Sequence, residues 1–347
     1  MRKVLILTGS YWWGHNAAAS SLKDYYETKW YQTKVVDIID FVNKFLAKST
    51  KEFYKVSSED YPKIWETFFN VTDYPIVARL LYWIKDPIWQ PKFDKMIEEF
   101  QPDKVISVFP FWNWWVKNYI KSKWHNFSWW IFITDAINIQ SFWYVRDKYV
   151  DKYFVIDEFS KNEFIKKFDY PEDKVVVSFF PFQKNKFINK KQIKNDNILL
   201  LLTGLETDFV DNFLSKTNKN IIVLKWRNKE LFDYLKIKYF DRFKFLDFLP
   251  ILDNLKDIDL LIWKCWWALT CECIATDTPL LVPNYFPWQE EGNLLLLQKT
   301  ETGIFESNPE KMNFLINYVD WNKFLPNFQK VKKISSLEII DSNLTTI

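Results

Sequence analysis

Short apolar strands alternate with helical segments along the whole chain, and this alternation constrains the fold more than any other feature. Chains of this kind form parallel sheets whose two faces are covered by helices. Strands are expected at 3–8, 34–39, 103–109, 130–134 and 152–156, and then at 197–202, 220–225, 243–246, 257–262 and 279–282. The sequence therefore predicts an α/β protein with two doubly wound, Rossmann-like parallel sheets.

The length of the chain and one polar stretch indicate two domains. A chain of 347 residues exceeds the size at which one hydrophobic core keeps growing. Residues 181–195 are largely polar and basic, as linkers often are. We expect an N-terminal domain at 1–188, a C-terminal domain at 189–330 and a tail at 331–347. Because ligands of doubly wound folds bind at the carboxyl ends of the strands, two such domains facing each other would share a central cleft.

Charge, hydropathy and cysteines exclude several classes of protein. The 47 basic and 44 acidic residues give a net charge of +3, which is too balanced to indicate a nucleic-acid partner. No apolar run reaches the roughly 18 residues of a membrane span, and the first strand is too short to be a signal peptide. Three clustered cysteines, Cys265, Cys271 and Cys273, without an export signal indicate reduced thiols in the cytosol. Their spacing does not suit a metal site.

Glycine is rare in this chain and tryptophan is abundant. The sequence contains 5 Gly and 19 Trp among 347 residues, whereas ordinary proteins contain roughly 7% glycine. The two counts together come close to the usual share of glycine alone. We hypothesise that many of the tryptophans are UGA codons that the source organism translates as glycine. The alternative is a surface that is genuinely rich in tryptophan.

The positions of the tryptophans favour the glycine hypothesis. A strand-to-helix turn that takes positive φ, or that lets a phosphate approach the backbone, tolerates glycine and excludes an indole. Trp30 falls where a C-capping glycine is usual, Trp226 lies between a strand and a helical segment, and Trp143 has the pattern of a genuine tryptophan. The tryptophans at strand-to-helix turns are Trp12, Trp13, Trp266, Trp267 and Trp288.

The first of these turns carries a histidine at the start of a helix. The segment TGSYWWGH leads into a helical segment that begins at Asn16. With glycine at Trp12 and Trp13, Gly14 completes a run of three glycines that can hold a reactive group against bare backbone. Because a helix N-terminus disfavours the imidazolium, His15 is expected to be available as a base near neutral pH. The alternative is a histidine that only caps the helix.

The second turn predicts an anion site. A buried strand leads into the turn KCWWALTCE, whose end is helical. Free N–H groups at a helix start bind anions and Thr270 can add a hydroxyl, so a diphosphate is the natural ligand. Glu272 can accept hydrogen bonds from a ribose diol. Gln289, Glu290 and Asn293 follow the next strand and offer the groups that sugar hydroxyls require; a solvated helix start is the alternative.

These segments resemble those of the two-domain GT-B glycosyltransferases of family 28, which include monogalactosyldiacylglycerol synthases and processive diacylglycerol glucosyltransferases. The GGGH turn of that family matches WWGH at His15, and its I-T-K-x-G-G turn matches IWKCWW at Lys264. Its G-[RK]-N-x-x-L segment matches WRNKEL, and its P-G-Q-E-x-x-N segment matches PWQEEGN. The resemblance covers almost the whole chain and implies the GT-B fold.

The resemblance also implies a reaction. It is the inverting transfer of a hexose from a UDP-sugar, bound by the C-terminal domain, to a lipid acceptor such as diacylglycerol, bound by the N-terminal domain. The UDP-sugar is a substrate, and no metal or other cofactor is implied. His15 would be the base that deprotonates the acceptor hydroxyl, and Asp135 matches a family segment that faces the cleft. Two departures are Ser10, where plant members carry Asp, and Leu269, where Thr is usual.

The resemblance assigns two groups of binding residues. The acceptor loop would consist of Trp12, Trp13, Gly14 and Asn16. The donor site would consist of Arg227, Asn228, Phe248, Lys264, Trp266, Trp267, Ala268, Leu269, Thr270, Glu272, Gln289, Glu290 and Asn293.

Aromatic, aliphatic and basic residues interleave between residues 45 and 93. This mixture suits an anionic membrane surface, so we expect a cytoplasmic protein that associates peripherally with the inner face of the cell membrane. The alternative for each apolar member is that it faces the core. The apolar members are Phe53, Tyr54, Trp65, Phe68, Phe69, Leu80, Leu81, Tyr82, Trp83, Ile84 and Trp89. The basic members are Lys48, Lys51, Lys55, Lys63, Arg79, Lys85 and Lys92.

Two other functions stay open from the sequence. A nonhydrolysing UDP-sugar epimerase shares the fold and the donor, but it needs no membrane surface and usually carries more carboxylates and histidines in its cleft. A non-catalytic relative is expected if the tryptophans are real, because indoles at 266 and 267 would block the diphosphate. The sequence does not separate glucose, galactose and N-acetylhexosamines, which differ by one or two hydroxyl contacts.

Overall fold

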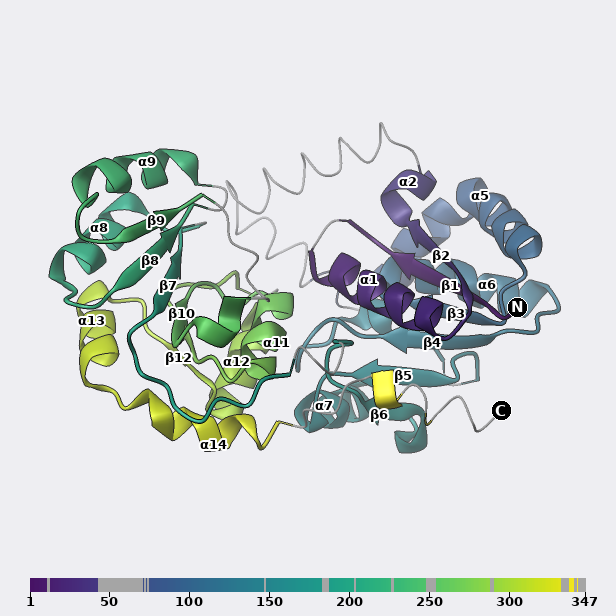
Figure 1. The fold of residues 1–347 in the computed structure, drawn as a ribbon. Coiled ribbons are helices and arrows are strands. Elements are labelled where there is room, and N and C mark those ends of the chain that lie inside the picture. Colours follow the sequence, from purple (N-terminus) through teal and green to yellow (C-terminus); the bar gives the residue numbers. More distant parts are fainter. Residues whose placement is uncertain are drawn as a thin grey trace. The chain divides into compact units, whose positions relative to one another are not determined.

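The protein divides into two compact units, each built on its own parallel sheet (Figure 1). One unit comprises Met1–Gln183 with Ile334–Ile347, and the other comprises Lys184–Lys333. The computed structural model describes residues 1–10, 13–42, 71, 73, 75–146, 148–182, 187–202, 204–225, 228–247, 254–287, 290–331, 337–339 and 342; of residues 13 and 75–87 it describes only the backbone.

The described part of the N-terminal unit has a sheet of six parallel strands in the order β2-β1-β3-β4-β5-β6. These strands are β1 (Lys3–Thr8), β2 (Gln32–Asp37), β3 (Lys104–Ser107), β4 (Ser128–Phe132), β5 (Lys152–Val155) and β6 (Val175–Val177). The helices of this unit are α1 (Trp13–Thr28), α2 (Ile38–Val42), α5 (Pro75–Phe100), α6 (Asn113–Ser122) and α7 (Glu158–Phe168). Short 3-10 turns are η1 (Pro110–Trp112), η2 (Ser141–Trp143) and η3 (Glu172–Lys174).

The described part of the C-terminal unit has a second sheet of six parallel strands in the order β12-β11-β10-β7-β8-β9, which is the Rossmann order. These strands are β7 (Ile198–Leu201), β8 (Ile221–Leu224), β9 (Lys244–Leu246), β10 (Leu260–Ile262), β11 (Leu280–Val282) and β12 (Gly303–Phe305). The helices are α8 (Thr207–Lys216), α9 (Lys229–Lys238), α11 (Trp267–Ala275), α12 (Glu291–Thr300), α13 (Pro309–Tyr318) and α14 (Leu325–Phe328). Its 3-10 turns are η5 (Leu255–Asp257) and η6 (Trp321–Phe324).

The two sheets confirm the predicted α/β fold with two doubly wound domains. Their central strands are apolar on both faces, as covered parallel sheets require. Leu260–Ile262, for example, is fully buried along its whole length. The strands expected from the sequence are all present, and β6 and β12 are two that the sequence analysis did not predict.

Each sheet has a point where the chain reverses its direction of winding. In the N-terminal unit this point lies between β1 and β3, and in the C-terminal unit it lies between β7 and β10. The loops that leave such a pair of strands diverge to opposite sides, which opens a crevice at the carboxyl ends of the strands. A ligand site is therefore expected in the segments that follow these four strands.

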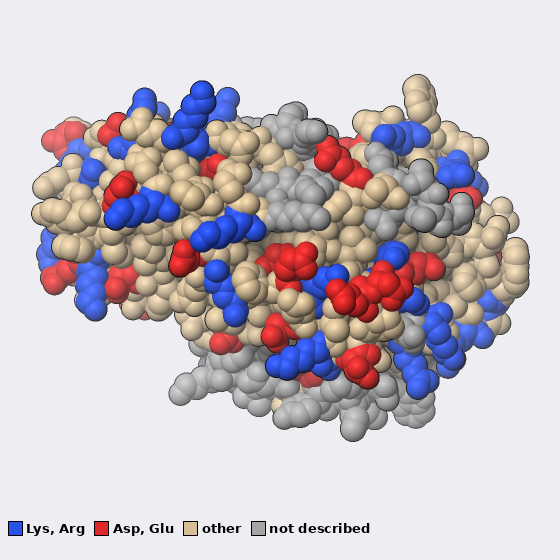
Figure 2. Space-filling model, turned by 90° about the horizontal axis from the view of Figure 1, so that it is seen from below, with Lys and Arg blue, Asp and Glu red and all other residues tan. Residues whose placement is uncertain are grey.

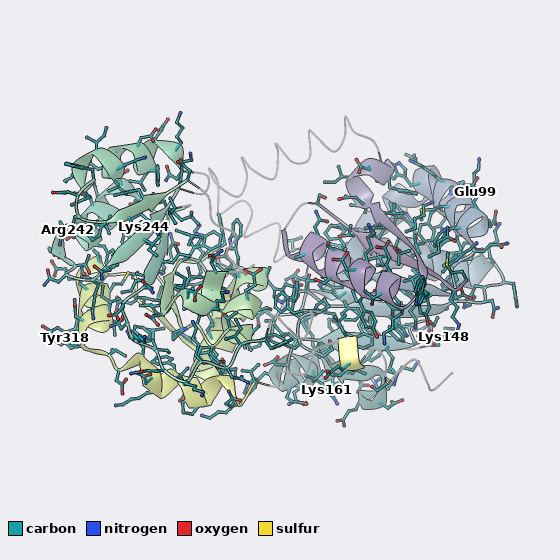
Figure 3. All side chains as sticks on the ribbon, in the orientation of Figure 1. Glu99, Lys148, Lys161, Arg242, Lys244 and Tyr318 are labelled. Carbon is teal, nitrogen blue, oxygen red and sulfur yellow. The ribbon has the colours of Figure 1, made fainter. Side chains whose placement is uncertain are left out.

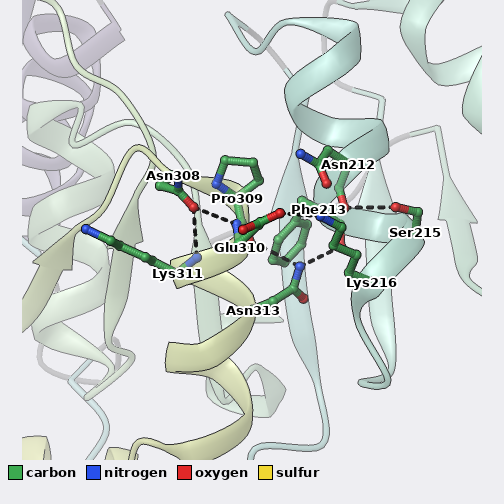
Figure 4. A network of polar contacts seen from close by, with 9 residues as sticks. All are labelled: Asn212, Phe213, Ser215, Lys216, Asn308, Pro309, Glu310, Lys311 and Asn313. Atoms are coloured by element: carbon green, nitrogen blue, oxygen red, sulfur yellow. Dashed lines mark hydrogen bonds and ion pairs between the residues drawn. The ribbon is translucent and has the colours of Figure 1, made fainter.

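The packing of α13 on α8 illustrates how polar groups are satisfied inside the C-terminal unit (Figure 4). Asn308 caps α13, since its side-chain oxygen accepts from the N–H groups of Glu310 at 2.9 Å and Lys311 at 3.0 Å. Asn313 on the same helix donates to the carbonyl of Phe213 at 2.9 Å. The helix pair is thus held by directed bonds as well as by apolar contact.

The surface is mixed in charge. Basic and acidic side chains are interspersed over the face drawn in Figure 2, in keeping with the net charge of +3. Figure 3 places labelled side chains such as Glu99 and Arg242 on the outside of their units, and both are exposed. None of the described helices combines the length and apolarity that a membrane crossing requires.

Candidate functional site

His15 lies in the first turn of α1, at the reversal point between β1 and β3. Its Nδ1 atom is 2.6 Å from the carbonyl oxygen of Val108 and 3.0 Å from the hydroxyl of Thr134. The ring packs edge-on against Phe109 with 4.9 Å between centroids. Val108 follows β3 and Thr134 follows β4, so the carboxyl ends of three adjacent strands together hold the imidazole.

These contacts determine the protonation state of His15. A carbonyl oxygen can only accept, so Nδ1 carries the proton and Nε2 keeps its lone pair. The side chain is 4% exposed, and burial lowers the pKa of His15 to about 4, although Val108 and the charge of Asp37 act in the opposite direction. The imidazole is therefore neutral at neutral pH, mainly because of burial rather than because of the helix end that the sequence suggested.

Asp135 is connected to His15 through an aromatic side chain. The indole N–H of Trp143 donates to Asp135 Oδ2 at 2.6 Å, and the Trp143 ring lies 6.3 Å from the ring of His15. Burial raises the pKa of Asp135 to about 6 despite this hydrogen bond. Trp143 is 1% exposed and its N–H is bonded, so it has the environment of a genuine tryptophan, as the sequence suggested.

The sequence analysis missed the groups that orient His15. Val108 and Thr134 follow strands of one sheet and bond to the ring, although they lie far from His15 along the chain. Asp37, the last residue of β2, acts on the ring through its charge. The available signal was their common position at the carboxyl ends of predicted parallel strands. Ser10, at the departure from the plant pattern, bonds through its N–H and its hydroxyl to Asp37.

The other acceptor-loop residues are placed in part. Gly14 and Asn16 are half-buried in the first turn of α1, and the side chain of Asn16 accepts from the Thr8 hydroxyl at 3.1 Å. Trp13 begins α1, and Trp12 lies outside the described residues.

Most of the aromatic and basic segment 45–93 lies outside the described residues or is described only in its backbone. Trp89 is partly buried and packs on the core, with its ring 6.4 Å from that of Trp115. Lys92 lies 4.6 Å from the ring centroid of Phe41 and bonds to its carbonyl. These two members contact the protein itself, and the membrane role of the segment stays a prediction.

In the C-terminal unit, α11 begins directly after β10, at the second reversal point. Trp266 is the residue before the helix and provides no side-chain cap for it. Thr270, in the first turns, is fully buried, and its hydroxyl has no hydrogen-bond partner among the described residues. Uncapped N–H groups beside a hydroxyl without a partner are what an anionic ligand would satisfy.

Lys264 and Gly204 come together beside this helix start. Gly204 follows β7 and has φ of +72°, and a Cβ atom there would lie 2.4 Å from Lys264 Nζ. The Gly204 carbonyl accepts from Asn284, which follows β11, at 2.7 Å. Lys264 is 7% exposed and its Nζ lies 4.2 Å from the ring centroid of Phe286. The ammonium group of Lys264, the start of α11 and Gly204 thus lie at the same end of the sheet.

Glu290 is buried next to Lys264. It is 3% exposed, its Oε2 accepts from the N–H of Phe286 at 2.7 Å, and the indole of Trp266 donates to it. Burial raises the pKa of Glu290 to about 7, although Lys264 and both hydrogen bonds lower it. With the indole in place, the carboxylate expected to bind sugar hydroxyls is bonded within the protein.

The remaining predicted donor residues occupy the helix starts of the same unit. Asn228 caps α9 by accepting from Leu231 N at 3.2 Å. Asn293 is 4% exposed in the first turn of α12. Within α11, Trp267, Ala268 and Glu272 are half-buried and Leu269 is buried. Three further members lie outside the described residues: Arg227, Phe248 and Gln289.

Trp30 ends α1 in a conformation that glycine adopts most readily. Its φ is 62°, its N–H donates to the carbonyl of Glu27 at 3.1 Å, and the N–H of Tyr31 donates to that of Tyr26 at 3.1 Å. This pair of bonds is the Schellman motif, in which glycine usually takes the left-handed position. The side chain of Trp30 is 86% exposed, so packing does not explain an indole there.

Within the described ranges, no group of three or more histidine, cysteine and acidic side chains is arranged to hold a metal ion. The three cysteines are buried thiols that form no disulfide within the described ranges. Burial raises the pKa of Cys265 and of Cys273, which keeps both thiols protonated.

Comparison with known proteins relates the chain to glycosyltransferases of the GT-B fold. Residues 15–177 match the model of the monogalactosyldiacylglycerol (MGDG) synthase family. MurG of Acinetobacter baumannii superposes with a TM-score of 0.66 at 10% identity over 100% of both chains. The chain has the GT-B fold, and its residues 15–177 resemble the MGDG synthase family. No curated protein matches its sequence.

Two more solved structures share this fold. The calicheamicin glycosyltransferase CalG4 has a TM-score of 0.65 at 9% identity, covering 99% of this chain and 98% of its own. The glycosyltransferase VinC, solved in complex with dTDP, has a TM-score of 0.59 at 10% identity, covering 99% of each chain. The family match begins at His15, after β1, and includes Asp135.

Proposed function

We propose that this glycosyltransferase moves a hexose from a UDP-sugar to a lipid alcohol such as diacylglycerol, with inversion at the anomeric carbon. The observation that carries the proposal is the match of residues 15–177 to the MGDG synthase family. That match covers the unit in which His15 is held neutral, with Nε2 as its basic atom. The same unit would bind the lipid acceptor.

The proposed reaction needs one base and one anion site. His15 Nε2 accepts the proton of the acceptor hydroxyl while the hydroxyl oxygen forms a bond to the anomeric carbon. The bond from that carbon to the diphosphate breaks, and UDP leaves with the electron pair. The uncapped start of α11 and the hydroxyl of Thr270 would stabilise the departing diphosphate without a metal ion. The dTDP complex of VinC supports a nucleoside diphosphate as the ligand of this fold.

We further propose that the protein made by the source organism has glycine at several of the printed tryptophans. Trp30, exposed and left-handed, is one support, and the low glycine count of 5 is another. At Trp266, glycine would remove the indole that bonds Glu290 and would leave the helix start open to a phosphate. The other positions in this proposal are Trp12, Trp13, Trp226, Trp267 and Trp288.

The codons of the gene and mass spectrometry of peptides from the native organism test the glycine proposal directly. A functional test compares the printed chain with the Trp266→Gly/Trp267→Gly variant for thermal stabilisation by UDP. A ligand at 100 times its Kd stabilises the folded state by about 2.7 kcal/mol, and we expect this only in the glycine form. Trp143→Gly is the matched control and should be destabilised by about 3 to 5 kcal/mol, because it empties a buried site.

We also propose that the enzyme works in the cytoplasm, bound peripherally to the inner face of the cell membrane. The support is the lipid acceptor that the family match suggests, together with the aromatic and basic composition of residues 45–93. Sedimentation with anionic and with neutral phospholipid vesicles tests this proposal. Binding to anionic vesicles that weakens with salt supports it, and equal recovery in the supernatant of both vesicle types contradicts it.

The catalytic proposal is tested with the purified Trp266→Gly/Trp267→Gly form, UDP-glucose or UDP-galactose, and vesicles that contain diacylglycerol. We expect a glycolipid and free UDP as products, and a rate lower by about 10² to 10⁴ in His15→Gln. Interconversion of the UDP-sugars without a lipid product would instead identify an epimerase. Absence of UDP stabilisation in both the tryptophan and the glycine forms would identify a non-catalytic relative.

A further inference from the structure

A carboxylate at the end of β2, Asp37, is tied to the turn that carries His15. Ser10 donates its N–H to Asp37 Oδ1 at 3.3 Å and its hydroxyl to Oδ2. The same hydroxyl accepts from Asn16 Nδ2 at 2.7 Å, and Asn16 Oδ1 accepts from the Thr8 hydroxyl at 3.1 Å. This chain of hydrogen bonds connects Asp37 to both ends of the turn between β1 and α1.

Asp37 also carries a negative charge that acts on the imidazole of His15. Its negative charge acts on His15 and favours the protonated ring, against the larger effect of burial. Asp135 bonds instead to the indole N–H of Trp143. Three groups that contact the ring are uncharged: the carbonyl of Val108, the hydroxyl of Thr134 and the ring of Phe109.

A buried histidine that acts as a base needs a counter-charge. Once His15 accepts a proton, the imidazolium sits in a site that disfavours charge. We propose that Asp37 is the positioning residue that supplies this counter-charge, and that Ser10 and Asn16 hold it beside the turn. The inference rests on the proposed function, because it requires His15 as the base. It adds a residue from β2 to a site that the sequence assigned to the β1–α1 turn and Asp135.

The first test follows the protonation of His15 without any assay of activity. The chain has only two histidines, His15 and His125, so histidine-selective isotope labelling gives two imidazole signals, with His125 as the internal reference. In Asp37→Asn the amide oxygen can still accept hydrogen bonds while the charge is gone. We expect the midpoint of the His15 titration to fall by about one pH unit. An unchanged midpoint would overturn the proposal.

Two further variants separate charge from structure. Ser10→Ala removes the hydroxyl bond and keeps the carboxylate, so the His15 titration should stay close to that of the wild type. Asp37→Glu restores the charge and should recover most of the wild-type titration and activity, which also covers a folding defect in Asp37→Asn. A shift in Ser10→Ala as large as that in Asp37→Asn would overturn the charge argument.

The activity of the same variants distinguishes this inference from the proposed function. In Asp37→Asn we expect kcat to fall about ten- to a hundredfold, the acid limb of kcat/KM to move to lower pH, and KM for the UDP-sugar to stay constant. Full activity in Asp37→Asn, with His15→Gln inactive, would overturn the role of Asp37 and leave the proposed function standing. Full activity in His15→Gln would overturn the base assignment itself, while the titration would still report on the charge of Asp37.

Discussion

Replacing His15 with glutamine should remove a specific part of the acid sensitivity of the N-terminal unit. Glutamine can still donate an amide hydrogen toward the carbonyl of Val108, but it does not titrate. The wild-type imidazole is buried and neutral, with a pKa of about 4 in the folded protein. In the unfolded chain the ring is solvated and has its ordinary pKa of 6.5.

The two pKa values define the pH window and the sign of the effect. Between pH 6.5 and pH 4 the unfolded state binds the proton and the folded state does not, so stability falls as the pH falls. A difference of about 2.5 between the pKa values, at about 1.36 kcal/mol for each, amounts to about 3 kcal/mol. Below pH 4 both states are protonated and the contribution of His15 no longer changes.

Asp135 changes the stability with pH in the opposite direction to His15. The His15→Gln variant is therefore needed to separate the two effects. Its pKa is raised from 3.8 to about 6 in the folded protein, so the folded state binds the extra proton and stability rises as the pH falls through that range. The wild type therefore shows only a sum of opposing terms. The difference between wild type and His15→Gln isolates the histidine, provided that Asp135 is unchanged in both.

Urea unfolding at pH 7 and at pH 4, read by pulsed hydrogen exchange of peptides from β1 and β3, measures the free energy of unfolding of this unit alone. Chemical labelling of the three buried cysteines, all in the C-terminal unit, follows that unit as an internal control. The wild type should lose about 3 kcal/mol more than His15→Gln between the two pH values. Equal losses in the two proteins would refute the assignment of a neutral, buried imidazole.

Three other substitutions test the C-terminal site and the left-handed turn, and the first two are made in the Trp266→Gly/Trp267→Gly background, in which UDP binding is expected. Thr270→Val should stabilise the UDP-free protein by about 1 kcal/mol, because it removes a buried hydroxyl without a described partner, and should weaken UDP binding about tenfold; unchanged affinity in calorimetry would argue against contact with the ligand. Gly204→Ala should lower the free energy of unfolding by about 1 to 2 kcal/mol and weaken UDP binding, since its Cβ would displace Lys264. Trp30→Gly should raise the free energy of unfolding by about 1 kcal/mol, whereas Trp124→Gly, at an equally exposed position without positive φ, should not; equal effects in urea titrations would contradict the strain argument.

The strands could be predicted from the sequence where one apolar run spans the whole element. The segment KVLILT gives β1 with the bounds Lys3–Thr8, as expected. β6 and β12 were missed, and each has only three residues at the edge of its sheet. Length and edge position do not by themselves explain this, because β9 shares both and was predicted.

The sequence could predict where a site residue lies in its local turn, but not which distant residues contact it. His15 and Thr270 were found because a strand followed by a small-residue turn and a helix places them at a helix start. The partners of His15 were not found, since Val108 and Thr134 are 93 and 119 residues away and reach it only through sheet order. Burial, which dominates the pKa of His15, likewise follows from tertiary packing.

The N-terminal unit is discontinuous in sequence, because it contains residues 334–347 as well as 1–183. During synthesis the ribosome therefore completes the entire C-terminal unit before the last piece of the first unit emerges. Leu337, which is 7% exposed in the finished protein, joins that unit only at that moment. The N-terminal unit of a nascent chain thus lacks residues 334–347 through most of translation. An expression fragment that ends at residue 183 would lack them permanently.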